Sequence, residues 1–230
     1  MNILGIIPAR SNSKGIKNKN IKIINGKNLI YYTIKRAKES NLISHLISST
    51  NSKKYKNLFH KYGVWTPRLR PKKLARDNSN IISTLIYETK LVEKLQKIKF
   101  DFIILLQVTS PNRKRGEIDN NLKKVIKGNY DSLISLCPLN TTHPEKMKRI
   151  KKKQVFNYIK ESKENPPRQK LEQLYVPSGN VYIIRRDVLI KKKNLIGKKQ
   201  TFHIIDKKDF VNIDDEDNLN LAKIKLKKFI

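Results

Sequence analysis

The sequence is poor in cysteine and has no long apolar run. Its 230 residues include one cysteine, Cys137, so an intramolecular disulfide framework and a cysteine-based metal cluster are excluded, which suits a reducing cytosol. The longest apolar run, residues 102–106, is far shorter than the roughly 20 residues of a membrane-spanning helix. The first residues lack the basic head and cleavage site of a signal peptide. We therefore expect a cytoplasmic protein without a membrane partner.

Acidic residues are also scarce, because 19 Asp and Glu stand against 51 Lys and Arg, giving a formal charge of +32. Such an excess invites a nucleic-acid interpretation. The basic residues, however, occur in nearly every segment rather than on one element, and most are lysines. Lys, Ile and Asn share AT-rich codons, so biased base composition would enrich all three. We favour a solvated lysine surface with weak affinity for polyanions, and expect no specific nucleic-acid partner.

Apolar strand-like segments alternate with helical patterns, which is typical of an α/β protein. Strands are expected at 2–8, 45–50, 101–107, 132–137, 180–184 and 209–213, and helices at 29–40, 52–62, 81–98, 118–126 and from about Asp215. Asn51 is a candidate N-cap for the second helix. The pattern predicts a mostly parallel sheet with helices on both faces, and ligands bound beyond the carboxyl ends of the strands. A length of 230 residues fits a single domain, 1–230.

The character of the chain changes between residues 138 and 175. Prolines become frequent, three consecutive lysines occur at 151–153, and apolar periodicity fades. We interpret this segment as an excursion from the main sheet, serving as a lid or as a dimerisation arm.

The segment "IIPARSNSKGIKNKN", residues 6–20, is a basic loop that follows the first strand. Gly15 would let the backbone approach a ligand closely, and fixed cations would neutralise phosphate charge, so the loop could wrap a triphosphate. It is neither a Walker A loop nor a dinucleotide fingerprint, because the chain has no Gly-x-Gly and Lys14 precedes Gly15. An ordinary basic surface loop is the alternative.

Seven motifs, in order along the chain, resemble those of the acylneuraminate cytidylyltransferases. They are "IPARSNSKGIKNKN", "ISSTNS", "LRPKKLARDNS", "LLQVTSP", "PPRQKL", "YVPSGNVYI" and "NIDDEDNLNLA". The resemblance implies a three-layer, Rossmann-like nucleotidyltransferase fold. It also implies transfer of CMP from CTP to the anomeric hydroxyl of a nonulosonic acid of the sialic, legionaminic or pseudaminic type, with pyrophosphate released.

The same resemblance assigns a nucleotide site. Arg10, Lys19 and Asn20 would contact the phosphates, and Ser13 and Lys14 would shape the turn. Fixed cations suit the charge that develops on departing pyrophosphate, so Arg10 and Lys19 are catalytic candidates. Arg76 and Asp77 would contact the base or ribose, although Asp77 could instead cap the following helix.

A sugar site is implied as well. Gln107, at the end of a buried strand, matches the family glutamine that contacts the sugar, although such a strand-end amide could merely satisfy loop backbone. The further candidates are His143, Lys146, Arg168, Ser178 and Asn180. A guanidinium can bond both carboxylate oxygens of the acidic sugar. Ser178-Gly179 replaces the Asn-Gly usual in the family, which leaves the particular sugar open.

The acidic run 214–217 stands out in so basic a chain. By the resemblance, Asp214 would bind Mg²⁺, with Asn212 contributing an amide oxygen where relatives have aspartate. Asp214 is therefore the third catalytic candidate. The remaining acids could simply oppose the dipole of the last helix.

Two alternatives stay open at this point. One is a cytidylyltransferase for 3-deoxy-octulosonic acid, and the other is a non-catalytic relative that binds polyanions through its lysines. The family resemblance further implies a homodimer formed through residues 138–175, with CTP and an acidic nine-carbon sugar as ligands.

Overall fold

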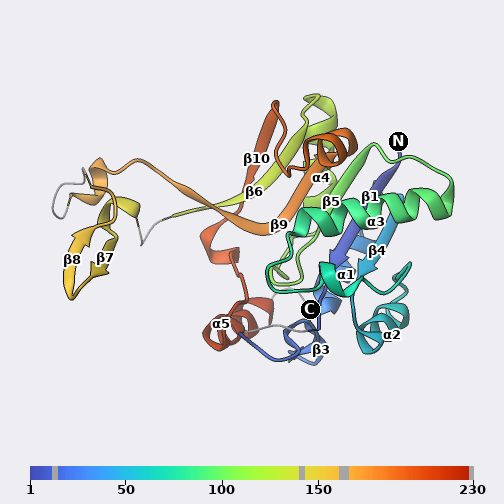
Figure 1. Ribbon diagram of the computed structural model, residues 1–230, viewed down its shortest axis with the longest axis horizontal. Coiled ribbons are helices and arrows are strands. Elements are labelled where there is room, and N and C mark those ends of the chain that lie inside the picture. Colours follow the sequence, from blue (N-terminus) through green and yellow to red (C-terminus); the bar gives the residue numbers. More distant parts are fainter. Residues whose placement is uncertain (12–14, 140–142, 161–165, 228–230) are drawn as a thin grey trace.

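A computed structural model describes residues 1–11, 15–139, 143–160 and 166–227. Within these residues, six strands form one sheet in the order β10-β6-β9-β5-β1-β4 (Figure 1). They are β1 (Ile3–Pro8), β4 (His45–Ser49), β5 (Phe102–Leu105), β6 (Ser132–Pro138), β9 (Tyr175–Arg185) and β10 (Gln200–Ile204). Every pairing is parallel except the two that β9 makes with β5 and β6. The predicted mostly parallel sheet is confirmed.

Helices account for most of the remaining regular structure. The α-helices are α1 (Leu29–Lys38), α2 (Lys53–Lys61), α3 (Ile81–Gln96), α4 (Glu117–Lys127) and α5 (Glu216–Leu226). Short 3₁₀ turns are η1 (Lys19–Ile21), η2 (Lys72–Leu74), η3 (Pro144–Lys146), η4 (Arg168–Lys170) and η6 (Lys207–Asp209), and η5 (Val188–Lys192) is a π-helix. Two small hairpins join β2 (Ile23–Ile24) to β3 (Lys27–Asn28) and β7 (Lys148–Lys151) to β8 (Gln154–Asn157). Among the described residues, no helix is both long and apolar enough to cross a membrane.

The sheet is buried on both faces, which explains why β5 is apolar throughout. Successive strand residues point to opposite faces. Ile103 and Leu105 therefore join the apolar cluster that contains Leu85 of α3. Phe102 and Ile104 join the other cluster, which contains residues of α1, α2, α4 and α5. Helices on both sides of a sheet make the three layers that the sequence predicted.

One predicted strand is wrong. Residues 209–213 form no strand, although Val211 and Ile213 are buried. Ile213 instead donates its N–H to the carbonyl oxygen of Thr109, at 2.9 Å, which fixes this loop beside the end of β5. The edge strand beside β6 is β10, which the sequence analysis missed. Its exposed Phe202 and Ile204 give it the half-buried pattern of an edge strand rather than that of a core strand.

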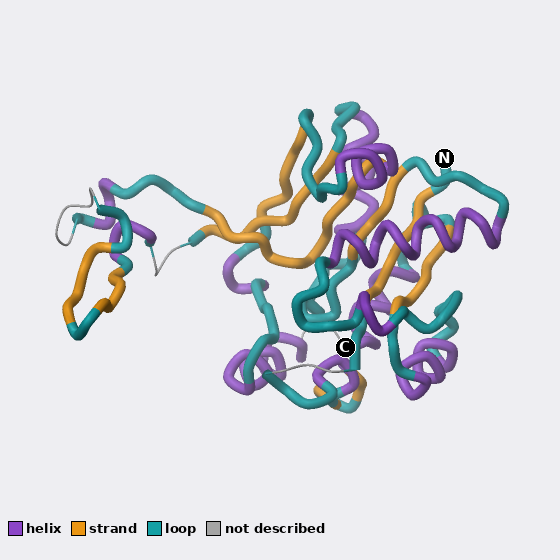
Figure 2. Tube along the Cα trace, in the orientation of Figure 1, coloured by secondary structure: helices purple, strands orange, loops and turns teal. Residues whose placement is uncertain are grey.

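The segment 138–175, called the arm below, leaves the sheet at the end of β6 and returns at the start of β9. Pro138 pairs with Tyr175 where it leaves and returns. The arm extends away from the sheet and carries the β7–β8 hairpin near its far end (Figures 1 and 2). Ile150 and Val155 of this hairpin are exposed, as are all residues of β7.

A buried arginine, Arg113, organises the loop between β5 and α4. Its guanidinium donates to the carbonyl oxygens of Gln107 (2.7 Å), Gly179 (3.3 Å) and Asn180, and to the Thr33 hydroxyl (3.0 Å). Burial lowers the pKa of Arg113 to about 10, although the nearby Glu117 raises it. A cation is retained here because it satisfies three carbonyls that no apolar side chain could satisfy.

Replacing Arg113 by methionine should lower the free energy of unfolding by on the order of 3 kcal/mol, because the buried carbonyls lose their donor. The measurement is urea denaturation. Arg115→Met is the matched control, since Arg115 is exposed in the same loop, and it should change stability by less than about 0.5 kcal/mol. Equal denaturation midpoints for the two variants would contradict this account.

Candidate active site

A cleft of about 440 Å³ opens at the carboxyl ends of β1 and β5, where Pro8 and Gln107 contribute to its wall. This is the sheet edge at which the sequence analysis expected a ligand. The predicted site residues that line it are Arg10, Lys19, Asn20, Arg76, Asp77, Gln107 and Asp214. Residues from both ends of the chain thus meet in one cleft.

The basic loop after β1 is fixed at both of its described ends. Asn20 donates its side-chain N–H to the carbonyl oxygen of Arg10, at 2.9 Å. The N–H of Ser11 donates to Asn51 Oδ1 at 3.0 Å. Asn51 therefore anchors this loop, and the prediction that it caps α2 is wrong, because Ser52 is the N-cap and accepts from the Tyr55 N–H. Ser13 and Lys14, predicted to shape the turn, lie outside the described residues.

Arg10 crosses the cleft to the segment that precedes α3. Its Nη1 lies 3.1 Å from Asp77 Oδ1 and donates to the carbonyl oxygen of Arg76 at 3.0 Å. The alternative in which Asp77 caps α3 is wrong, because Asn80 is the N-cap and accepts from the Ile82 N–H at 2.8 Å. Asp77 instead holds the Arg10 guanidinium at the cleft wall.

Lys19 connects the basic loop to residues 212–217, which contain the acidic run and are called the acidic segment below. Its Nζ donates to the carbonyl oxygen of Ile213 at 2.6 Å and lies 3.1 Å from Asp214 Oδ1. Only 11 % of the Lys19 side chain is exposed, whereas 64 % of the Asp214 side chain is exposed. Gly15 touches the same segment so closely that any Cβ there would overlap the carbonyl oxygen of Asp214. The two segments therefore form one surface.

Asn212 and Asp214, the predicted metal ligands, have adjacent side chains. Asn212 Nδ2 donates to Asp214 Oδ2 at 2.7 Å. The following Asp215 caps α5 and accepts from the Asn218 N–H at 2.7 Å. In the described part of the chain, no three His, Cys, Asp or Glu residues form a group that could hold a metal ion. Asp214 is thus an exposed carboxylate in the cleft, and Asp215 has a structural role.

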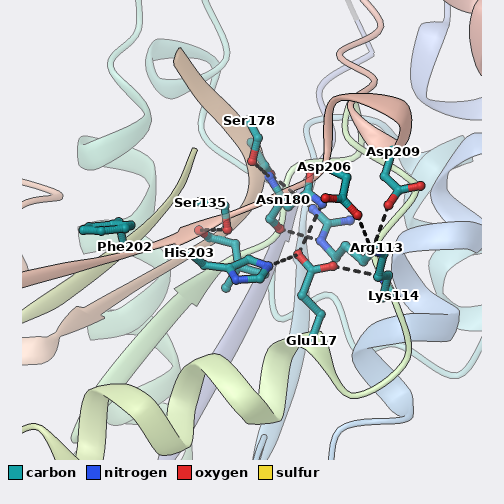
Figure 3. A network of polar contacts seen from close by, with 12 residues as sticks. Arg113, Lys114, Glu117, Ser135, Ser178, Asn180, Phe202, His203, Asp206 and Asp209 are labelled. Atoms are coloured by element: carbon teal, nitrogen blue, oxygen red, sulfur yellow. Dashed lines mark hydrogen bonds and ion pairs between the residues drawn. The ribbon is translucent and has the colours of Figure 1, made fainter. Parts of the chain in front are cut away.

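Two predicted sugar ligands lie elsewhere. Ser178 and Asn180 are each only 1 % exposed, and neither lines the cleft. A bulge in β9 sends the Asn180 amide toward α4, where it donates to Glu117 Oε1 at 3.2 Å (Figure 3). Gly179 between them has a φ of 77°, and a Cβ there would collide with Ser110 Oγ and the Gln107 side-chain oxygen. The bulge therefore positions Gln107, and Ser178 and Asn180 lie behind it, outside the lining of this cleft.

The remaining predicted sugar ligands belong to the arm. His143 caps η3, where its Nδ1 accepts from the Glu145 N–H at 3.2 Å, and Lys146 ends that turn. Arg168 begins η4, but its side chain lies outside what the structure describes. The arm extends away from the sheet (Figure 1). Neither His143 nor Lys146 is among the residues that line the cleft.

Arg70 is a cleft residue that the sequence analysis missed. Its guanidinium donates to the Ser49 carbonyl oxygen (2.6 Å) and hydroxyl (2.9 Å), and Ser49 in turn donates to Glu88 of α3. The pKa of Arg70 is lowered to about 10, mainly by burial, with Glu88 raising it and the charge of Arg10 lowering it. The sequence feature that could have indicated its role is the presence of an arginine, in a chain whose cations are mostly lysines, within the motif "LRPKKLARDNS".

Burial also raises the pKa of Glu88 to about 7, although the Ser49 hydrogen bond and the charge of Arg70 both lower it. Between pH 4.5, its ordinary pKa, and pH 7, the folded protein binds more protons at Glu88 than the unfolded chain does. The contribution of Glu88 to the free energy of unfolding is therefore greatest near pH 4.5 and declines as the pH rises toward 7.

Glu88→Gln should remove this pH dependence. From pH 4.5 to above pH 7, the free energy of unfolding of the wild type should fall relative to that of the variant by on the order of 3 kcal/mol. Urea denaturation across the pH series measures the difference. A constant offset between the two proteins at every pH would show that Glu88 keeps its ordinary pKa.

Comparison with known proteins identifies the family of this chain. The cytidylyltransferase family model matches residues 4–227. The chain is 32% identical over 206 residues to CMP-N,N′-diacetyllegionaminic acid synthase of Legionella pneumophila, covering 86% of this chain and 84% of that protein. It is 29% identical over 227 residues to post-translational flagellin modification protein B of Campylobacter coli, covering 98% and 95%.

A solved structure shares the fold. The complex of CMP:2-keto-3-deoxy-manno-octonic acid synthetase with CTP matches the whole of both chains with a TM-score of 0.72, at 15% identity. The Rossmann-like nucleotidyltransferase architecture is therefore confirmed. Since the family match extends over nearly the entire sequence, this chain belongs to the cytidylyltransferase family.

Proposed function

We propose that this protein transfers CMP from CTP to the anomeric hydroxyl of a nonulosonic acid and releases pyrophosphate. The observation that carries the proposal is the contact between Lys19 and Asp214, which unites the basic loop and the acidic segment in one cleft. The family match over residues 4–227 and the CMP-nonulosonate synthase among its relatives support the same reaction.

The cations of the cleft suit this chemistry. The sugar oxygen forms a bond to the α-phosphorus while the bond to the bridging oxygen of pyrophosphate breaks, so negative charge accumulates on the leaving group. Arg10 and Lys19 would meet that charge. Both are already held by protein contacts, Arg10 by Asp77 and Lys19 by the Ile213 carbonyl, so little reorganisation is needed at the moment of reaction.

The segment before α3 would bind the nucleoside part of CTP. Arg76 and Asp77 line the cleft, where both contact Arg10, and the buried Arg70 lines it beside Ser49 at the end of β4. The Arg70 guanidinium is fixed by Ser49, so it presents its remaining donors in a defined direction. A fixed planar donor set is suited to reading the edge of a pyrimidine.

A divalent cation, Mg²⁺, fits the donors of the acidic segment. Mg²⁺ is usually bound by one or two protein carboxylates together with substrate phosphates and water. Asp214 supplies one exposed carboxylate in the cleft. The Asn212 side chain lies beside it with its amide N–H toward the carboxylate, so the amide would have to turn to present its oxygen to the ion. When bound, the ion would neutralise phosphate charge. Lys19 shares the Asp214 carboxylate and would keep it oriented.

Gln107 is the proposed contact to the sugar within the same chain, because its amide lines the cleft and is held against Gly179. Among the described residues, no other predicted sugar ligand lines this cleft. We propose that the arm of a second copy supplies the others, His143, Lys146 and Arg168, in a homodimer. Exposed apolar residues on the arm, among them Ile150 and Val155, support such a contact.

The protein is incubated with CTP, Mg²⁺ and a panel of sialic, legionaminic, pseudaminic and 3-deoxy-octulosonic acids. It should release pyrophosphate with at least one of the first three. Asp214→Asn should lower kcat by about a hundredfold or more, because a metal-binding carboxylate is lost. The assay is coupled pyrophosphate detection.

Asp215→Asn is the matched control, because an asparagine at the N-cap of α5 preserves the cap and the cleft is untouched. It should retain near wild-type activity. Absence of pyrophosphate with every nonulosonic acid, or release only with 3-deoxy-octulosonic acid, would contradict the proposed substrate class.

The arm proposal predicts complementation between chains. Asp214→Asn and Lys146→Ala should each be nearly inactive as pure proteins. Mixed and reassembled in equal amounts, they should recover about a quarter of the wild-type sites, because half of the dimers would contain one intact cleft facing one intact arm. Pyrophosphate assays on the mixture measure the recovery. A mixture no more active than its components would place Lys146 outside the active site of the partner.

A further inference from the structure

A buried glutamate, Glu88 of α3, lies behind the wall of the cleft. Its side chain is fully buried, and its Oε1 accepts from the hydroxyl of Ser49 at the end of β4. Its Oε2 has no partner in the described part of the chain. Thr84, one turn earlier on α3, lines the cleft, whereas Glu88 does not. Among the described residues, Ser49 is therefore the group through which this carboxyl can act on the cleft.

Ser49 connects Glu88 to Arg70, which does line the cleft. Arg70 Nε donates to Ser49 Oγ at 2.9 Å, and Arg70 Nη2 donates to the Ser49 carbonyl oxygen at 2.6 Å. The main chain of Arg70 is held at the same place, because its N–H donates to the carbonyl oxygen of Thr50 at 2.7 Å. One edge of the guanidinium and the backbone are thus both fixed to the end of β4.

The second edge of the Arg70 guanidinium, formed by Nη1 and Nη2, can serve a ligand. An arginine has five N–H donors in a rigid fork, and the bonds to Ser49 use two of them. The remaining donors have no acceptor in the described part of the chain. Cytosine presents two adjacent acceptors, O2 and N3, to such an edge, whereas uracil carries an N–H at N3. A guanidinium held in one orientation can therefore distinguish the two bases.

The orientation of Arg70 depends on its neighbours. Burial lowers the pKa of Arg70, the charge of Glu88 raises it, and the charge of Arg10, which lines the same cleft, lowers it. Arg10 therefore repels the Arg70 guanidinium. The Ser49 hydroxyl has a single hydrogen and donates it to Glu88, so its lone pairs are left to accept from Arg70. Glu88 thus fixes the direction in which Ser49 accepts.

We propose that Glu88 is a positioning residue of the nucleotide site, which, by accepting from Ser49, holds the Arg70 guanidinium in the orientation that selects cytosine over uracil. This inference rests on the proposed function, in which Arg70 contacts the base of CTP. Glu88 does not line the cleft, so it touches neither the nucleotide nor the reacting atoms. Its effect is on nucleotide affinity and selection.

Isothermal titration calorimetry at pH 8, with Mg²⁺ and either CTP or UTP, tests the proposal without any sugar. Glu88→Leu removes the acceptor at similar side-chain volume and should weaken CTP binding by about tenfold, because a charged donor loses its fixed orientation. UTP should bind about as before, so discrimination between the two nucleotides should fall by a similar factor. Glu88→Gln keeps an oxygen that can accept from Ser49 and should restore CTP affinity to within about twofold of wild type.

Glu93→Leu is the matched control. Glu93 also lies on α3 and is bonded to an arginine, because its carboxylate accepts from Arg186 at 2.8 and 2.9 Å, but neither residue lines the cleft. This variant should lower the melting temperature and leave CTP affinity unchanged. Ser49→Ala removes the connecting hydroxyl with a smaller change in volume. It should weaken CTP binding as Glu88→Leu does, and it tests the proposal even where Glu88→Leu does not fold.

A double-mutant cycle separates positioning from a general structural role. In an Arg70→Lys background the planar donor fork is already lost, so Glu88→Leu should weaken CTP binding no further. Losses that add, or equal losses in Glu88→Gln and Glu88→Leu, would overturn the positioning role. So would a Glu88→Leu variant that binds CTP as tightly as the wild type. A wild type that binds no CTP would instead refute the proposed function itself, and this inference with it.

Discussion

The ammonium group of Lys19 is the contact on which the candidate site depends. It joins segments 195 residues apart, because its donors reach both the Ile213 backbone and the Asp214 carboxylate. The Lys19 side chain is 11 % exposed, whereas that of Asp214 is 64 % exposed, so water screens the ion pair more than it screens the hydrogen bond to Ile213. Since α5 follows the acidic segment and packs into the same apolar cluster as α1, burial of α5 also holds Asp214 opposite the basic loop. Packing energy and site geometry are therefore coupled.

Much of the fold could be predicted from local pattern. β1 and β5 are apolar throughout because both faces are covered, and the helical spacing of residues such as Leu122 and Val125 places α4 on the sheet. β10 escaped prediction because an edge strand buries only part of one face, and its alternation is weak. The buried loop at Val211 was mistaken for a strand because burial alone does not determine backbone pairing.

The family resemblance assigned Arg10, Lys19 and Asp214 to one site, and the structure shows that all three line one cleft. The site was not predictable where tertiary geometry decides. The bulge at Gly179 turns Asn180 toward α4, and no sequence pattern indicates on which side of the sheet that amide lies. Arg70 looks like one of many surface cations until burial and its bonds to Ser49 single it out.

The pairing of Pro138 with Tyr175 has an evolutionary consequence. Because the arm starts and finishes at adjacent positions on neighbouring strands, residues can be gained or lost between them without shifting the sheet register. The arm is therefore a replaceable insertion, which related proteins could exchange while the nucleotide cleft is conserved. Specificity for the acceptor and self-association would then diverge together, at a rate independent of the chemistry of the shared donor.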